Sequence, residues 1–243
     1  MRFLTLFVSL LVSSSFAQEA PDAVKLLHDA EASRGVLAAN GLQWTVDVVS
    51  QEDSETDEAK LVVKTQGPFA LAEILEPDTS AGKKYLVADG DMWFSKPGTR
   101  AVPINKRMQL AGRAAIGEIA SSSFMSEYNI AETTQTTLEG EACTLYELEK
   151  KPGATYAKVL LWVSNEERVS RQAHFYTITG KHIRSATFEH KAKIKAGGNV
   201  IPFLSGLVVT EMIGSSRSTL LSFSEYKIYP GGFPDSTFDR KAM

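Results

Sequence analysis

The chain has 243 residues, of which 26 are Lys or Arg and 29 are Asp or Glu, so its formal net charge at pH 7 is −3. This mild acidic balance, without a long basic run, argues against nucleic acid as the main partner. The only cysteine, Cys143, excludes an intrachain disulfide, and a chain of this length can bury enough apolar surface to fold without one.

The first residues have the pattern of an export signal. Arg2 precedes an apolar run from Phe3 to Val12, and Ser15 and Ala17 occupy the small-residue positions before a cleavage site. The sequence therefore predicts a signal peptide over residues 1–17 and a mature chain in the periplasm. An uncleaved N-terminal anchor is the alternative, although the apolar run is shorter than the ~20 residues that a spanning helix needs.

A helix and a strand are predicted next. Over residues 21–35, Asp22 favours a helix N-terminus and apolar residues recur at helical spacing. Residues 42–48 alternate between apolar and polar, as in a half-buried strand. We interpret the acidic run at 51–58 as a solvated hairpin tip. A calcium site is the alternative, but the run lacks the ligand spacing of an EF-hand loop.

Short strand patterns separated by turn signals fill most of the remaining chain. The clearest turn is Asp89-Gly90 between two apolar runs, because glycine tolerates the positive φ that a tight hairpin needs. The predicted strands cover residues 61–65, 69–75, 85–88, 92–94, 133–137, 142–149, 156–163, 170–177, 183–190, 208–212, 219–223 and 226–229. This spacing predicts a mainly β fold, an antiparallel sheet curled into a barrel or part-barrel, in one domain over residues 18–243.

Several strands carry apolar residues on both faces, as in 158–163 and 174–176. A sheet with one wet face should alternate cleanly, so helices, a second sheet or a ligand should cover each face. After the predicted strand 92–94, Pro97-Gly98 leads into a basic and apolar segment rich in small residues, which we interpret as a flap over the sheet.

Residue patterns for catalysis or metal binding are not found. The histidines, at positions 28, 174, 182 and 190, lack the spacing of a zinc site. No G-x-S-x-G motif occurs, and Cys143 fits a small core residue better than a nucleophile. The sequence thus predicts no catalytic residue, no metal and no cofactor.

Four stretches together resemble a known family. They are residues 91–98 (DMWFSKPG), 115–124, 160–181 and 217–238, which span most of the chain. They are similar to motifs of the LolA/LolB-like periplasmic carrier superfamily, and within it of the outer-membrane lipoprotein-sorting proteins. The resemblance implies a half-closed antiparallel β-barrel with a helical lid or plug over an apolar cavity. It also implies a carrier of lipoprotein or lipid acyl chains, whose relatives often accompany RND/MmpL-type inner-membrane exporters.

Candidate site residues follow from strand parity and aromatic size. The proposed cavity residues are Trp44, Val46, Phe69, Leu71, Trp93, Tyr146, Leu160, Trp162 and Phe175. Lys106, Arg107 and Arg113 are candidates for contact with lipid head groups or with a partner, and a solvated basic face is the alternative.

The leading hypothesis is a non-catalytic, monomeric periplasmic carrier that shelters acyl chains between the inner and outer membranes. The alternative is an accessory or sensor domain that carries nothing and docks on an RND/MmpL-type envelope transporter. A third hypothesis, an envelope enzyme that acts on lipids, would require a polar catalytic group inside the cavity.

Overall fold

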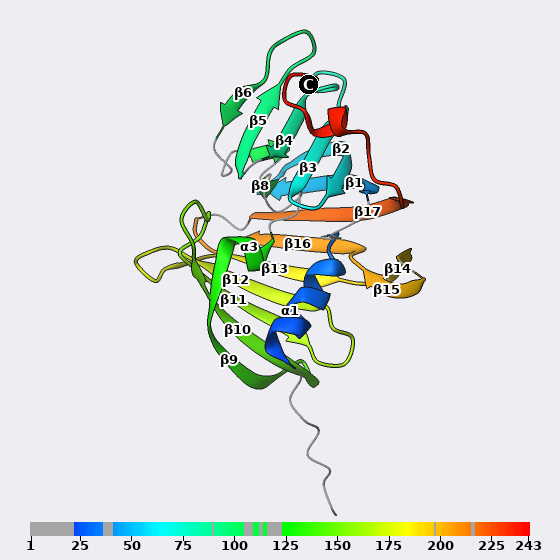
Figure 1. The fold of residues 1–243 in the computed structure, drawn as a ribbon. Helices are drawn as coiled ribbons and strands as arrows, with labels where there is room; N and C mark the ends of the chain where they lie inside the picture. The colour runs from blue at the N-terminus through cyan, green and yellow to red at the C-terminus, as the bar shows by residue number, and fades with distance from the viewer. Residues whose placement is uncertain are drawn as a thin grey trace, which may run out of the picture.

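The computed structural model describes residues 22–35, 41–88, 90–104, 109–111, 114–115, 123–196, 198–214 and 217–243. One antiparallel sheet of 13 strands dominates it, in the order β6-β5-β4-β3-β2-β1-β17-β16-β13-β12-β11-β10-β9. Because β6 and β9 end the sheet without pairing to each other, the sheet is not closed. The long strand β17 pairs with β1 and thereby joins the two halves (Figure 1).

The strands of the N-terminal half form a meander of hairpins. They are β1 (Gly41–Glu52), β2 (Glu55–Gln66), β3 (Phe69–Glu76), β4 (Lys84–Ala88), β5 (Asp91–Ser95) and β6 (Val102–Ile104). A small hairpin of β7 (Gln109–Ala111) and β8 (Ala114–Ala115) follows and makes a separate two-stranded sheet.

A second meander and a return to the middle of the sheet complete the chain. The strands are β9 (Tyr128–Leu138), β10 (Glu141–Lys150), β11 (Lys158–Ser164), β12 (Ser170–Tyr176), β13 (His182–Glu189), β16 (Gly206–Glu211) and β17 (Arg217–Tyr229). Between β13 and β16 lies a separate hairpin of β14 (Ala192–Ala196) and β15 (Asn199–Phe203).

Among the residues that the structure describes, two helices and a short 3₁₀ turn accompany the sheet. They are α1 (Ala23–Ala32), α3 (Phe124–Glu127) and η1 (Asp235–Phe238). Strands β9–β13 curve around α1, which lies against one side of the sheet (Figure 1). We call the side that α1 packs against the inner face and the opposite side the outer face. Within the described ranges, no helix is long and apolar enough to cross a membrane.

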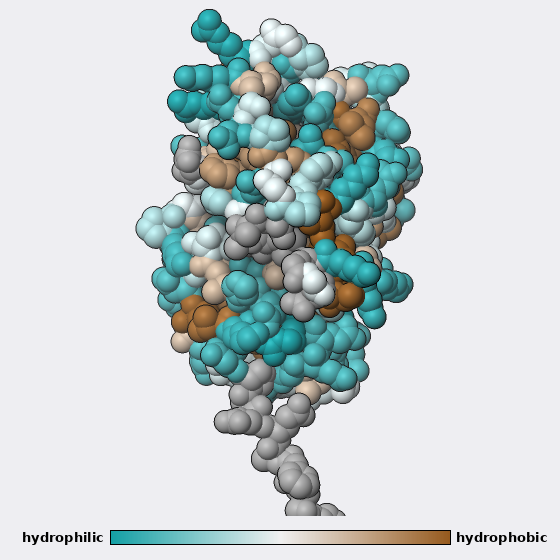
Figure 2. All heavy atoms as spheres, turned by 45° about the vertical axis from the view of Figure 1, so that its right-hand side comes forward, coloured by the Kyte–Doolittle hydropathy of each residue, from teal (hydrophilic) through white to brown (hydrophobic). Residues whose placement is uncertain are grey.

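The core lies mainly between α1 and the inner face. Leu26 and Leu27 of α1 belong to one buried cluster that also includes side chains from both halves of the sheet. A smaller cluster, on the outer face of β3–β5, packs against Phe238 and Met243 from the end of the chain. Figure 2 shows the exposed apolar residues on one side as small patches in a largely hydrophilic surface.

The predicted fold class is confirmed, because the structure is mainly β and its large antiparallel sheet is half-open. The helix predicted at 21–35 corresponds to α1. Strands β4 and β5 pair as the predicted hairpin, with Ala88 opposite Asp91, and Asp89 of the predicted turn lies outside the described residues. The predicted strands 219–223 and 226–229 form one continuous strand, β17, and the predictions missed β6, β7, β8, β14 and β15.

Candidate functional site

The inner face carries a row of apolar side chains that crosses five strands. Cross-strand register places Trp44 opposite Val63, Val63 opposite Ala72, Ala72 opposite Tyr85, and Tyr85 opposite Phe94. Directly opposed residues point to the same side of a sheet, so the five side chains form one surface. The first three are fully buried, Phe94 is half-buried, and its ring centroid lies 4.9 Å from that of Tyr85.

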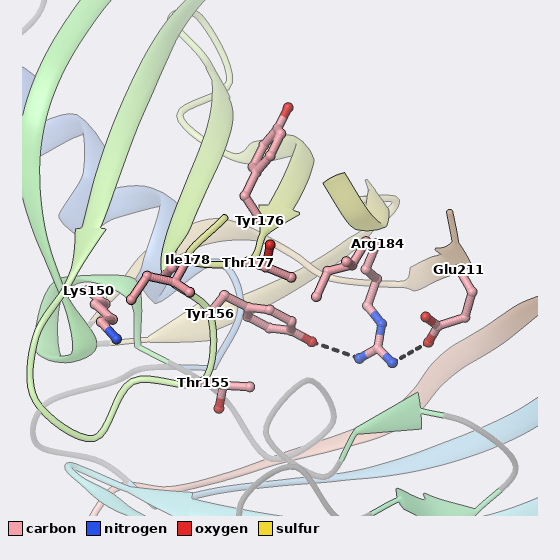
Figure 3. A pocket seen from close by; sticks show the side chains of 10 residues that line it. Lys150, Thr155, Tyr156, Tyr176, Thr177, Ile178, Arg184 and Glu211 are labelled. Atoms are coloured by element: carbon pink, nitrogen blue, oxygen red, sulfur yellow. Dashed lines mark hydrogen bonds and ion pairs between the residues drawn. The ribbon is translucent and has the colours of Figure 1, made fainter. Parts of the chain in front are cut away.

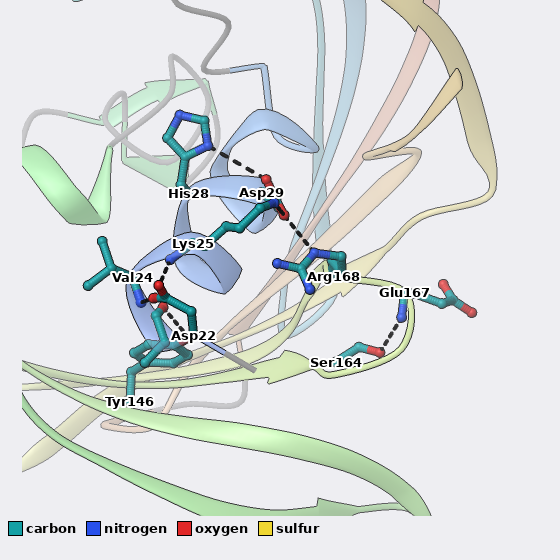
Figure 4. Close-up of polar contacts among 10 residues, drawn as sticks. Asp22, Val24, Lys25, His28, Asp29, Tyr146, Ser164, Glu167 and Arg168 are labelled. Carbon is teal, nitrogen blue, oxygen red and sulfur yellow. Dashed lines mark hydrogen bonds and ion pairs between the residues drawn. The ribbon is translucent and has the colours of Figure 1, made fainter. Parts of the chain in front are cut away.

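Polar contacts hold α1 on the inner face of the C-terminal meander, β9–β13 (Figure 4). The Tyr146 hydroxyl on β10 donates a hydrogen bond of 2.7 Å to the carbonyl of Ala23. Arg168, in the turn after β11, places its Nε 2.6 Å from a carboxylate oxygen of Asp29. Burial raises the pKa of Asp29, but hydrogen bonds from Lys25 and Arg168 outweigh it, and the net shift is downward. The helix is thus held at its first turn and near its middle.

A buried carboxylate links α1 to α3. Glu31 accepts a hydrogen bond of 2.7 Å from the Ser123 hydroxyl and one of 3.0 Å from the backbone N–H of Met125. Its Oε1 also lies 3.5 Å from a guanidinium nitrogen of Arg34, whose Cζ is 4.4 Å from the ring centroid of Phe124. Burial lowers the pKa of Arg34, and the charge of Glu31 opposes that shift. This pair therefore connects the helix, the start of α3 and the core.

A row of alternating charges crosses the inner face at one end of the sheet. Register places Phe175 opposite Arg184, Arg184 opposite Glu211, Glu211 opposite Arg217, and Arg217 opposite Glu52. Ion pairs join Arg184 to Glu211 and Arg217 to Glu52. We call these four residues the charged row. It continues the surface on which the buried ring of Phe175 lies.

A pocket of about 400 Å³ opens beside the first pair of the charged row (Figure 3). Tyr156 forms one wall, and its ring centroid lies 4.5 Å from that of Phe175. Its hydroxyl accepts a hydrogen bond of 2.7 Å from Arg184. In the same view, Lys150 and Ile178 lie on the side of Tyr156 that faces away from Arg184. The pocket thus combines an aromatic wall with charges of both signs.

Four of the nine predicted cavity residues lie on the inner face. Trp44, Val46, Tyr146 and Phe175 are buried there in the cluster that includes α1. Trp44 and Val46 come from β1, in the N-terminal half, whereas Tyr146 and Phe175 come from the strands that surround α1.

Three more predicted cavity residues lie together on the outer face. Phe69, Leu71 and Trp93 belong to the smaller cluster beneath the end of the chain. The Phe69 ring stacks on Phe238 at 5.7 Å, and the guanidinium carbon of Arg240 lies 4.7 Å from the Trp93 ring centroid. The C-terminal residues therefore cover these side chains.

Leu160 and Trp162 also lie on the outer face, away from that cluster. They are half-buried and alternate with Val159 and Leu161, which are fully buried on the inner face. Trp162 packs edge-on against His174 at 4.8 Å. The structure therefore does not bring the nine candidates together on one surface.

The candidate basic residues Lys106, Arg107 and Arg113 lie outside the described residues. The charged row, by contrast, was not predicted as a site. Glu52 had been assigned to a solvated hairpin tip, but its side chain is 23% exposed and paired with Arg217. Charged residues at the ends of otherwise apolar strands were the available signal, and their pairing depends on long-range register.

Histidine and cysteine positions are consistent with structural roles. His174 and His182 lie side by side, with ring centroids 4.6 Å apart, and burial together with the charge of His182 lowers the pKa of His174. Over the described part of the chain, no group of three or more potential ligands could hold a metal ion. Cys143 is fully buried, as predicted, and burial raises the pKa of its thiol.

Comparisons with known proteins identify the fold. A family model described as "Uncharacterized protein" matches residues 69–243. The chain belongs to that family. A LolA superfamily protein from Nitrosomonas europaea is similar in structure with a TM-score of 0.76 and 23% identity, over 90% of this chain and 98% of the other. The predicted resemblance to LolA is thereby confirmed for the fold.

Two further solved structures have the same LolA-like fold. An outer membrane lipoprotein-sorting protein domain from Vibrio parahaemolyticus matches with a TM-score of 0.72 and 16% identity, over 89% of this chain and 96% of the other. A DUF1329 family protein from Desulfovibrio piger matches with a TM-score of 0.68 and 18% identity, over 88% and 95%. None of the curated proteins matches the chain.

Proposed function

We propose that this LolA-like protein is a non-enzymatic periplasmic carrier, which holds the acyl chains of lipoproteins or lipids against the inner face of its sheet. The observation that carries the proposal is the apolar row from Trp44 to Phe94, which extends from the middle of the half-open sheet to its outer strands. Similarity of fold to an outer membrane lipoprotein-sorting protein domain supports the same class of cargo.

The hydrophobic effect would drive an acyl chain onto such an apolar surface. Each CH₂ group removed from water contributes about 0.8 kcal/mol, so a 16-carbon chain gains roughly 10 kcal/mol when it is sheltered. Val87, Phe94 and Ile104 are half-buried, and all pack against the inner-face cluster. Together with Trp44 and Val46 they form the wall that we assign to the hydrocarbon.

The three tryptophans allow a direct test of this assignment. Trp44 lies on the inner face, whereas Trp93 and Trp162 lie on the outer face. In a Trp93→Phe/Trp162→Phe variant the remaining fluorescence comes from Trp44, and 9,10-dibromostearate should quench it in a saturable manner. Trp44→Phe is the matched control, since its two outer tryptophans should keep most of their emission.

One further variant tests whether the outer strands contribute. Phe94→Glu places a carboxylate within the apolar row, and burying an unpaired charge is strongly unfavourable. We expect the affinity for dibromostearate to fall at least tenfold, while circular dichroism shows a folded sheet. The proposal is wrong if Trp44 is not quenched, or if protein isolated from a membrane-containing source carries no lipid in native mass spectrometry.

A second function is favoured by one surface feature. Ile178 is 81% exposed, and Met212 and Ile213 are 50% and 40% exposed. Ile178 lies in the turn after β12. Met212 and Ile213 lie in the turn after β16, where Met212 N donates a hydrogen bond of 3.0 Å to the carbonyl of Ile183 at the start of β13. Such a patch suits docking on an envelope transporter of the RND/MmpL type. Ile213→Asp, outside the lining of the pocket, should then abolish co-purification with that transporter and leave quenching by dibromostearate unchanged.

A further inference from the structure

The inner face changes from apolar to charged along β1 and its partner β17. Val48 lies opposite Leu221, Ser50 opposite Thr219, and Glu52 opposite Arg217. Successive pairs on one face are about 7 Å apart, because each residue advances a strand by about 3.4 Å. Hydrocarbon, hydroxyl and charged groups therefore follow one another over about 14 Å. A membrane lipid has the same order of groups, from acyl chain through glycerol ester to head group.

A pair of hydroxyl side chains lies between the apolar and the charged pairs. Ser50 Oγ and Thr219 Oγ1 lie 2.9 Å apart, and both residues are buried. Beyond them the side chains of the charged row are partly accessible, from 12% for Arg184 to 33% for Arg217. This end of the inner face is therefore polar and open to solvent. On the far side of the hydroxyl pair, Val48 and Leu221 are apolar.

We propose that the charged row and its adjoining pocket bind the head group of a zwitterionic phospholipid, with a phosphate and an ammonium group. This inference rests on the proposed function and names its cargo more closely. The row contains two guanidinium and two carboxylate groups, so a purely anionic or purely cationic head group would meet like charges. A zwitterion can pair with both.

The spacing of the row fits such a head group. Neighbouring strands lie about 4.8 Å apart, so opposite charges alternate at about that interval. In phosphoethanolamine, two carbons separate the phosphate oxygen from the ammonium group, which gives a similar separation of charge. The Arg217 side chain is 33% exposed, so its guanidinium group can donate to phosphate. The Glu211 carboxylate, at the pocket, can accept from the ammonium.

Lysophospholipids with one 16-carbon chain test the proposal, because they share the tail and differ in the head group. Competition against dibromostearate quenching, below micellar concentrations, should show that lysophosphatidylethanolamine binds the wild type at least fivefold more tightly than lysophosphatidylglycerol. Glu211→Gln should bring this ratio close to one. Glu52→Gln, at the other end of the row, should reduce the ratio as well and serves if the first variant does not fold.

Glu141→Gln is the matched control. Glu141 pairs with Arg171 at 2.8 and 3.0 Å elsewhere on the same sheet, so this variant should keep the wild-type ratio. Where palmitate binds, two results would overturn the inference. One is equal affinities for the two lysophospholipids in the wild type, and the other is an unchanged ratio in Glu211→Gln and Glu52→Gln. Failure of palmitate itself to bind would instead overturn the proposed function.

Discussion

The buried pair of Glu31 and Arg34 provides the sharpest prediction on stability. Their side chains are only 5% and 8% exposed, so water screens neither charge. Glu31→Leu removes the carboxylate beside the guanidinium and the acceptor for Ser123 and Met125. Breaking a buried ion pair in this way costs about 3–5 kcal/mol, because the remaining charge stays out of water. We expect the free energy of unfolding to fall by that amount.

Urea unfolding at pH 7, followed by circular dichroism, measures this loss. The double variant Glu31→Leu/Arg34→Met should recover to within about 1 kcal/mol of wild type, because two apolar side chains of similar volume replace the pair. Lys60→Met, which removes a half-exposed ion pair with Asp47, should cost at most about 1 kcal/mol. The reasoning fails if Glu31→Leu is as stable as Lys60→Met, or if the double variant is no more stable than Glu31→Leu alone.

Three further outcomes are expected. Burial lowers the pKa of His190 to about 3, so the folded state keeps the ring neutral while the unfolded chain gains a proton below about pH 6.5. Stability in urea should thus fall by up to about 1.4 kcal/mol per pH unit between pH 6.5 and 3, and His190→Gln should flatten this part of the profile. Phe238→Ala removes the ring stacked on Phe69 and should cost about 1–3 kcal/mol in urea, with dibromostearate binding unchanged. Cys143 should react with a thiol reagent such as DTNB only when urea unfolds the protein, because it is buried and its thiol pKa is raised.

Local sequence patterns were sufficient for most of the sheet. The period-2 alternation that predicts a strand at 42–48 depends on one face being buried, and residues 41–52 do bury Trp44, Val46 and Val48 on the inner face. Hairpins were also predictable, because a turn such as Asp89-Gly90 is a local signal. The strands β14 and β15 were missed, because the alternation of Ala192–Ala196 covers only five positions and Pro202 argues against a strand in the segment that pairs with it.

The face of each strand was harder to predict than the strand itself. Trp93 and Phe94 are adjacent aromatic residues on β5, so parity alone allows either to point inward. Choice by size favoured Trp93, but register places Phe94 in the row with Trp44, and the C-terminal Arg240 lies over Trp93. The deciding contact comes from a segment almost 150 positions away in the sequence. The charged row depends in the same way on pairing between distant strands.

The way in which α1 is held has a consequence for the proposed carrier. Leu26 and Leu27 bury themselves on the same apolar cluster that would attract an acyl chain, so hydrocarbon and helix compete for the surface. Apolar contacts are non-directional and one greasy group can replace another. The hydrogen bonds of α1 are directional, and an acyl chain cannot replace them. They join Ala23 to Tyr146, Asp29 to Arg168 and the buried Glu31 to Met125. They would keep α1 over β9–β13, so that an acyl chain would bind by replacing the apolar contacts that bury the row on β1–β5, next to the charged row at the end of the inner face.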